Sequence, residues 1–140
     1  MDQRVDANDL LICRGNGNVH LVGKGYFPPY DMPEITFPDT IIAARTSSDK
    51  IEPAFLQVFW NGPSVRRQIE SLARTTNGTF KINQAMLESI RLIEPPISLQ
   101  REFAAQVSAV DRLKAAHRAS LAKLDELFGS LQHRAFRGEL

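Results

Sequence analysis

Three groups of polar residues in the first two thirds of the chain have side chains suited to contacts with double-stranded DNA. Arginine and lysine neutralise phosphates, whereas asparagine and threonine offer hydrogen bonds to the edges of bases. We therefore predict that the cations of these groups contact phosphates and that their asparagines and threonines contact base edges. The residues are Arg14, Asn16 and Asn18 in one segment, Arg45 and Thr46 in a second, and Arg74, Thr76, Asn77 and Lys81 in a third.

Each group also has a structural interpretation that the sequence leaves open. The glycines of the first group are typical of a hairpin turn, because glycine tolerates positive φ. Residues 60–81 carry four Lys/Arg against Glu70, a local net charge of +3 that also fits the solvated face of a helix. The glycine spacing does not match a nucleotide-binding loop, since no glycine follows Gly17 at the required interval and Lys24 is not followed by serine or threonine.

No pattern for catalysis or metal binding is evident. The three histidines lie far apart, at positions 20, 117 and 133, and Cys13 is the only cysteine. A zinc site needs several such ligands at short spacings, and a catalytic triad needs a nucleophile beside a histidine in a shaped pocket. The acidic residues are scattered and suggest no carboxylate pair. We therefore predict a protein that is not an enzyme and that requires no cofactor or metal.

The composition is that of an ordinary globular domain. Residues 1–97 hold 10 Lys/Arg against 11 Asp/Glu, and residues 98–140 hold 7 against 5. Neither part is a polybasic clamp, so DNA binding would need a local patch or a larger assembly. We expect no membrane span, because no apolar run is long enough, and the first residues do not resemble a signal peptide. A single cysteine excludes an internal disulfide and fits a reducing cytoplasm.

Apolar patterns and turn residues predict a small mixed α/β domain of the α+β class, followed by a long helix. Residues 28–39 hold four prolines and are expected to be extended or irregular, and residues 75–79 are expected to form a loop. Two prolines at 95 and 96 end the domain, so we divide the chain into residues 1–97 and 98–140. We expect strands at Leu10–Cys13, Val19–Val22, Thr40–Ala44, Phe80–Ile82 and Ile90–Ile93, and helices at Pro53–Trp60 and Ser64–Arg74. A short helical turn is expected to start at Asn83 or Gln84 and to run through Leu87.

Residues 98–140 carry the most regular helical pattern in the chain. With Ser98 as its cap, a helix to about Ala135 would be roughly 57 Å long. Apolar residues recur every three or four positions, with charged residues around them, as in a helix that packs against another helix. We predict that this coiled-coil-type seam is a partner interface, in which His117 sets the register or packs partly buried. The seam residues are Phe103, Val110, Leu113, His117, Leu121, Leu124, Leu127, Phe128 and Leu131.

Two stretches of the sequence resemble the specificity (S) subunits of type I restriction-modification systems. They are NDLLICRGNGNVHLVGKG, at residues 8–25, and the run from TNGTFKINQ through IEPPISLQREF and the long helix to the closing LFGSLQHRAFRGEL. The resemblance implies a target recognition domain that reads part of a split DNA site, and a long helix that acts as a spacer. It also implies a non-catalytic subunit that positions adenine methyltransferase (M) and restriction (R) subunits on DNA.

The chain departs from the pattern that it resembles. Such subunits have two recognition domains and two helices packed antiparallel, whereas this sequence has one of each and lacks the strands expected ahead of Asn8. We therefore expect a truncated half-subunit that forms a homodimer through its helix. One alternative is a protein-interaction remnant that associates through the helix without reading DNA. A small-molecule enzyme, which would need a concave polar pocket, is a third alternative.

Overall fold

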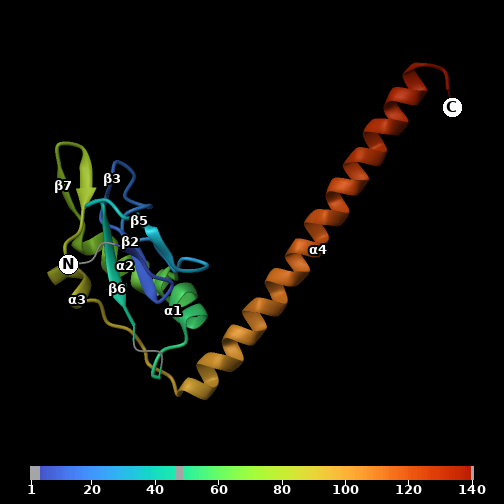
Figure 1. Cartoon of the computed structure of the whole chain (residues 1–140). Coiled ribbons are helices and arrows are strands. Elements are labelled where there is room, and N and C mark those ends of the chain that lie inside the picture. The colour runs from blue at the N-terminus through green and yellow to red at the C-terminus, as the bar shows by residue number, and fades with distance from the viewer. Residues whose placement is uncertain (1–3, 47–48, 140) are drawn as a thin grey trace. The chain divides into compact units, whose positions relative to one another are not determined.

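The computed structural model describes residues 4–46 and 49–139. This part of the chain contains antiparallel strands, three short helices and one long C-terminal helix, which confirms the predicted α+β class (Figure 1). The chain divides into two compact units, unit 1 (Met1–Glu102) and unit 2 (Phe103–Leu140). The functional boundary that we placed after residue 97 stays a prediction.

Eight short strands lie in the described part of unit 1 and form three small antiparallel sheets. They are β1 (Arg4–Val5), β2 (Asp9–Cys13), β3 (Gly15–Asn16), β4 (Gly25–Tyr26), β5 (Met32–Thr36), β6 (Ile41–Arg45), β7 (Arg74–Thr76) and β8 (Thr79–Lys81). One sheet pairs β1 with β5, the second has the order β4-β2-β6, and the third has the order β3-β8-β7. The predicted strands at Leu10–Cys13, Thr40–Ala44 and Phe80–Ile82 are therefore confirmed to within one residue at each end.

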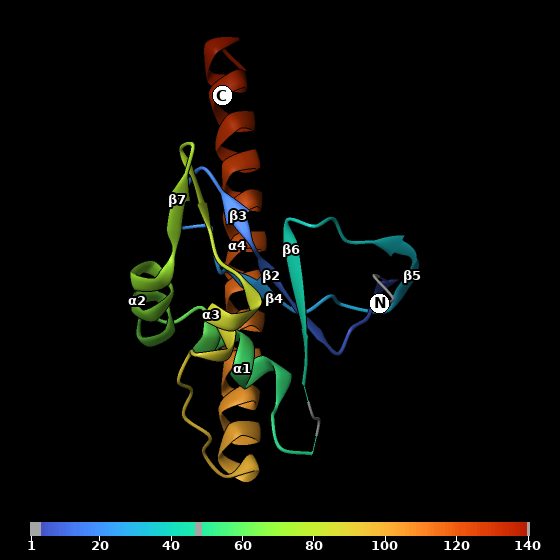
Figure 2. The same ribbon diagram turned by 90° about the vertical axis from the view of Figure 1, so that its left-hand side faces the viewer.

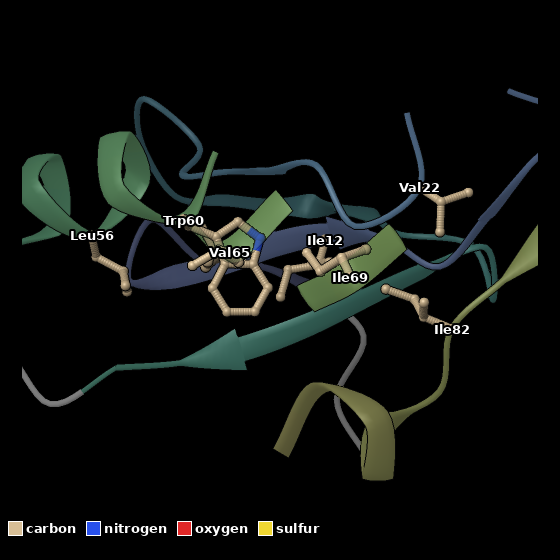
Figure 3. Close-up of a cluster of buried hydrophobic side chains, with 8 residues drawn as sticks. Ile12, Val22, Leu56, Trp60, Val65, Ile69 and Ile82 are labelled. Carbon is tan, nitrogen blue, oxygen red and sulfur yellow. The ribbon is translucent and has the colours of Figure 1, made fainter. Parts of the chain in front are cut away.

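Strand β2 supplies the middle of the hydrophobic core. Its five residues pair with those of β6 in continuous antiparallel register. Leu10 and Ile12 are two residues apart, so they point to the same face of the sheet, and each is only 1% exposed. Helices and loops cover this face with further apolar side chains. The buried cluster also contains Val22, Leu56, Trp60, Val65, Ile69 and Ile82 (Figure 3).

Three short helices accompany the sheets, and each begins within one residue of its prediction. Helices α1 (Pro53–Trp60) and α2 (Pro63–Leu72) both have proline in the first turn, where the missing N–H costs no hydrogen bond. Helix α3 (Gln84–Glu88) is capped by Asn83, whose side-chain oxygen accepts a hydrogen bond from the backbone N of Met86 at 2.9 Å. The apolar faces of the first two helices contribute to the core cluster.

Residues 19–22, which we predicted as a strand, form a turn instead. The side-chain oxygen of Asn18 accepts a hydrogen bond from His20 N at 3.0 Å, and the backbone oxygen of Asn18 accepts one from Leu21 N at 3.0 Å. These two bonds curl the chain where it would otherwise extend. Val22 is nevertheless fully buried, so an apolar run can mark a core turn as well as a strand. On the side of β2 away from β6, the pairing strand is β4, further along the chain.

The strand predicted at Ile90–Ile93 is absent from the described sheets, although this segment is held in place. The side chain of Gln68 donates a hydrogen bond to Arg91 O at 3.0 Å and accepts one from Arg91 N at 2.9 Å. This amide therefore satisfies both backbone groups of Arg91 that a neighbouring strand would bond. By contrast, the proline-rich segment 28–39 contains an extended strand, β5, as expected.

The long C-terminal helix is α4 (Ile97–Phe136), which has 40 residues and matches the predicted helix to within one residue at each end. Ser98 is its second residue, so the prediction that Ser98 caps the helix was wrong. Within unit 2 all nine residues of the predicted seam are exposed. Their role as a partner interface stays a prediction. Across residues 4–46 and 49–139, no helix combines the length and the apolar character needed to cross a membrane.

The first residues of α4 belong to unit 1 and are fixed there by Gln100, which is 1% exposed. Its side-chain oxygen accepts a hydrogen bond from Glu52 N at 2.9 Å. Its side-chain nitrogen donates to Lys50 O at 3.1 Å and to Pro95 O at 2.7 Å. Glu52 is the N-cap residue of α1 and makes no capping bond with its own side chain. One buried amide thus joins the start of α1, the chain before it and the start of α4.

Candidate nucleic-acid interface

The first and third groups of predicted DNA-contact residues meet in the sheet β3-β8-β7. Strand β3 pairs with β8 through Gly15 with Lys81 and Asn16 with Phe80, and β8 pairs in turn with β7. Figure 2 shows β3 beside the β7–β8 hairpin. Segments far apart in the sequence are therefore brought together, as a shared DNA-contact surface would require.

Strands β7 and β8 form a tight hairpin where we expected a helix end and a loop. Helix α2 ends earlier than predicted, and Thr76 pairs with Thr79 across a connection of two residues. These two residues, Asn77 and Gly78, have φ of 50° and 76°. Positive φ at both positions is the geometry of a type I′ turn, whose twist suits a hairpin. The Asn-Gly dipeptide is the strongest short-range signal for such a turn, and it could have revealed the hairpin from sequence.

The hairpin has one face toward the core and one toward solvent. Residues directly opposite each other in antiparallel strands share a face. Thr75 and Phe80 form a pair on one face, where Phe80 packs against the core cluster and Thr75 is exposed. Arg74 and Lys81 form a pair on the outer face, and both are exposed. The side chain of Thr76 lies outside the described part of the structure, so its base contact stays a prediction.

Arg74 and Lys81 place two positive charges opposite each other at the base of the hairpin. Like charges in this position destabilise a strand pair, on a scale of roughly 0.2–1 kcal/mol. Within the described chain, no hydrogen bond or ion pair engages the side chains of Arg74, Lys81 or Asn77. A Cβ added at Gly15 would lie 3.4 Å from Lys81 Cγ, so the lysine stem runs over this glycine. The fold thus holds two cations together without supplying an acidic partner from the described residues.

The side-chain oxygens of Asn16 and Asn18 are engaged within their own loop. Asn16 Oδ1 accepts a hydrogen bond from Asn18 N at 2.8 Å, and Asn18 Oδ1 accepts one from His20 N at 3.0 Å. Bonds of this local kind stabilise turns. Arg14 Nη1 donates to Asp39 O at 3.3 Å. The structural interpretation therefore accounts for these contacts, and DNA binding by the three residues of the first group stays a prediction.

The second group is not brought together with the other two. The register of β2 and β6 pairs Arg45 with Asp9, at the end of β2 opposite to Arg14 and roughly 14 Å from the other end of the strand. The guanidinium of Arg45 donates to Asp9 at 2.8 and 3.0 Å and to Asp6 at 2.9 Å. Asp9 is 6% exposed, so it depends on this cation for its charge balance. Thr46 follows Arg45 and lies at the same end.

Arg66 belongs to the basic segment but is used inside unit 1. Its side chain is 15% exposed, and it donates to Glu70 Oε1 at 3.0 Å and to Val19 O at 3.0 Å. His20 Nδ1 lies 3.3 Å from the same oxygen of Glu70. Desolvation acts to raise the pKa of Glu70, but hydrogen bonds from Arg66 and His20, with their charges, lower it below its usual 4.5. This network ties the turn at residues 19–22 to α2.

An open groove of about 1020 Å³ lies along β6 in unit 1. Apolar residues such as Ile42 and Leu87 line it together with charged residues, of which Asp6, Asp9 and Arg45 bind one another. The described lining contains no serine, cysteine, histidine or lysine. Nor does any group of three or more His, Cys, Asp or Glu among the described residues have the arrangement to hold a metal ion.

Two curated proteins are similar to this chain over nearly its whole length, although no family model matches it. The chain is 29% identical over 142 residues to the type I restriction enzyme EcoKI specificity subunit of Escherichia coli (strain K12), with 98% of this chain and 30% of that protein aligned. It is 27% identical over 140 residues to the type I restriction enzyme StySPI specificity subunit of Salmonella potsdam, with 97% and 30% aligned. The chain thus spans about 30% of the length of these relatives. The matches confirm the resemblance inferred from the two stretches of sequence.

Proposed function

We propose that this chain is a DNA-recognition component of a type I restriction-modification system. The similarity to specificity subunits over nearly the whole chain supports this function. The observation that carries it is the Arg74–Lys81 pair, two exposed cations opposite each other on the outer face of the hairpin. DNA relieves the repulsion between such cations, because its phosphates are closely spaced along both strands.

In this proposal the chain contacts DNA through unit 1 and performs no chemistry itself. Methyltransferase subunits modify adenine, restriction subunits cleave, and both are positioned by this chain. The exposed seam of α4 supplies protein contacts. These partners follow from the resemblance to S subunits. Unit 1 is assigned the DNA contacts because it carries the polar and cationic groups, and α4 is assigned the protein contacts because it carries the apolar seam.

The test is a fluorescence-anisotropy titration of labelled duplex DNA with the chain assembled with its methyltransferase subunits, repeated at several salt concentrations. Each phosphate contact contributes about 0.9 to the slope of log K against log salt. We therefore expect the double variant Arg74→Ala with Lys81→Ala to bind more weakly and to lower the slope by about 2.

The control removes the same charge elsewhere in unit 1. Lys50 and Arg101 are both exposed; Arg101 lies in the first turns of α4, and Lys50 O bonds to the neighbouring Gln100. Figure 1 shows the start of α4 at the opposite end of unit 1 from the β7–β8 hairpin. The double variant Lys50→Ala with Arg101→Ala is expected to keep the wild-type slope. Absence of binding by the wild-type assembly at low salt, or an equal loss in both double variants, would refute DNA recognition through the hairpin.

We propose further that the seam of α4 pairs with the same helix of a second chain. Leu124 and Phe128 are 62% and 63% exposed, and the other seam residues are exposed as well. Apolar side chains repeated along a helix of 40 residues form a larger apolar surface than a soluble monomer usually displays. Two identical helices in antiparallel contact are related by a two-fold axis, so the contact closes as a dimer.

Sedimentation equilibrium tests the dimer, whose mass would be twice 15.7 kDa. Leu124→Asp places a charge in the seam and is expected to give a monomer. Ala122→Asp adds the same charge off the seam and is expected to leave the dimer intact. A wild-type monomer would refute helix pairing. A dimer that binds no DNA in the assembled complex would favour the interaction-only alternative.

A further inference from the structure

We propose that the β7–β8 hairpin enters the major groove of DNA and that Asn77, at its tip, contacts an A·T base pair. The inference rests on the proposed DNA-recognition function. It adds the structural element that reads the sequence and the side chain that makes the contact.

The tip of the hairpin has the dimensions of a groove-reading element. Strand β3 pairs with β8 only as far as Phe80, so residues 76–79 form a two-stranded tip beyond the third strand. Figures 1 and 2 both show this tip projecting from unit 1 on the side away from α1 and α3. Three residues of strand rise about 10 Å. The major groove is about 8.5 Å deep and admits a two-stranded β-ribbon.

The cation pair lies where the edges of the groove would be. Arg74 and Lys81 are at the base of the hairpin, on its outer face, and their side chains are long and exposed. With the tip inserted, these two residues reach the phosphates that border the groove. Phe80, on the other face, anchors the hairpin to the core, so the tip is presented by a packed element. The hairpin therefore has a phosphate-contacting base and a base-contacting tip.

Asn77 is the asparagine that keeps its amide available at this surface. The side-chain oxygens of Asn16 and Asn18 accept hydrogen bonds from backbone groups of their own loop. Asn77 is exposed, and its side chain makes no hydrogen bond with another residue of the described chain. In the major groove an asparagine amide accepts a hydrogen bond from adenine N6 and donates one to adenine N7. This pairing identifies an A·T base pair as the contact.

The positive φ of Asn77 determines which variants isolate the amide. Asn77→Gly removes the side chain and keeps a turn that glycine adopts without strain. Asn77→Asp keeps the size of the side chain and tolerates the same backbone, but it lacks the donor for adenine N7. Circular dichroism and thermal unfolding confirm that each variant retains its fold. The two variants together separate the loss of the amide from damage to the turn.

The experiment selects bound sequences from a randomised duplex library with the chain assembled with its methyltransferase subunits. Titrations on single-base-pair variants of the selected site then measure discrimination at each position. Asn77→Gly is expected to lose discrimination at one A·T pair by roughly 5- to 150-fold, with the other positions and the salt slope unchanged. Arg74→Ala with Lys81→Ala is expected to do the reverse, lowering the slope and keeping the base preference.

The outcomes separate this inference from the proposed function. A wild-type assembly that binds no duplex, or selects no sequence, refutes the proposed function and the inference together. If the wild type selects a site and both Asn77 variants select it with the same discrimination, the inference is overturned while DNA recognition stands. A loss confined to a G·C pair overturns the adenine contact. If Asn77→Gly alters the fold, the result for Asn77→Asp decides.

Discussion

Replacing Gln100 by methionine is expected to destabilise unit 1, although the two side chains have nearly the same length and volume. In the native chain the amide of Gln100 is 1% exposed and bonds to Glu52 N, Lys50 O and Pro95 O. Methionine offers no comparable donor or acceptor. One backbone donor and two backbone acceptors therefore lose their side-chain partner.

The size of the effect follows from how deeply these groups are buried. A buried backbone group without a partner costs about 1–3 kcal/mol. Lys50 is exposed and Glu52 and Pro95 are half-buried, so water replaces part of what is lost. Methionine also buries some additional apolar surface. We therefore expect the free energy of unfolding to fall by about 2–4 kcal/mol, a large part of the ~5–15 kcal/mol typical of a native protein.

Urea unfolding followed by tryptophan fluorescence measures this change. Trp60 is the only tryptophan, is 6% exposed, and donates a hydrogen bond from its indole to Gly23 O at 2.8 Å, so it reports on the core of unit 1. Gln132→Met makes the same substitution at an exposed position of α4 outside the seam. This control is expected to stay within about 0.5 kcal/mol of the wild type.

A second substitution separates hydrogen bonding from packing. Gln100→Glu keeps the shape of the side chain but places a carboxylate against Lys50 O and Pro95 O. It is expected to be less stable than Gln100→Met at neutral pH and to recover as the pH falls, because a protonated acid donates a hydrogen bond again. If Gln100→Met and Gln132→Met differ by less than about 0.5 kcal/mol, the amide contributes no measurable stability and the reasoning is wrong.

Two further perturbations test the packing and the electrostatics of unit 1. Gly23→Ala is expected to lower the free energy of unfolding by about 2–4 kcal/mol, because φ is +77° and the new Cβ would lie 2.6 Å from Ile69 Cγ2. Gly78→Ala is the control, since its φ is +76° but no atom lies within 4 Å of the new Cβ. In the same urea titration it measures the cost of backbone strain without the steric clash. The lowered pKa of Glu70 means that its carboxylate stabilises the fold above pH 4.5 and loses that effect as the pH falls through the folded-state value. Melting curves of Glu70→Gln and wild type are therefore expected to differ at neutral pH and converge in acid, and a constant difference would contradict the ion-pair network.

The elements that could be predicted from sequence are those set by local pattern. Leu10–Cys13 is a short continuous apolar run that a glycine-containing turn follows, so β2 was recognisable as a buried strand. Pro53 marks the first turn of α1, and Asn83 marks the cap of α3. The regular spacing of apolar residues in α4 located both of its ends to within one residue. In each case the signal and the structure that it specifies lie within a few residues of each other.

The errors arose where a polar side chain takes the place of a backbone partner. Gln68 bonds both backbone groups of Arg91, which lies 23 residues away, so no local pattern could show that residues 90–93 need no strand partner. Asn18 curls residues 19–22 by the same kind of bond over a shorter distance. Side-chain hydrogen bonds of this kind compete with sheet formation, and apolar periodicity carries no information about them.

The candidate site was predictable in residue type but only partly in arrangement. Arg74 and Lys81 were identified by their charge, but their position opposite each other depends on a hairpin at an Asn-Gly turn, where we predicted a loop. Arg45 was selected for the same reason, yet strand register places it beside Asp9, where it balances a buried carboxylate. Sequence shows that a cation is present, whereas only the fold shows whether that cation is already neutralised.

The left-handed backbone at the hairpin tip restricts what natural variation can do there. Asparagine, aspartate and glycine adopt positive φ readily, whereas β-branched and bulky residues are strained in that conformation. If the preferred DNA sequence changed through this tip during evolution, only a few residue types would therefore fit at position 77. Divergence among homologues is then expected to appear as insertions that lengthen the turn, or as exchanges on the flanking strands, while the tip residue itself changes little.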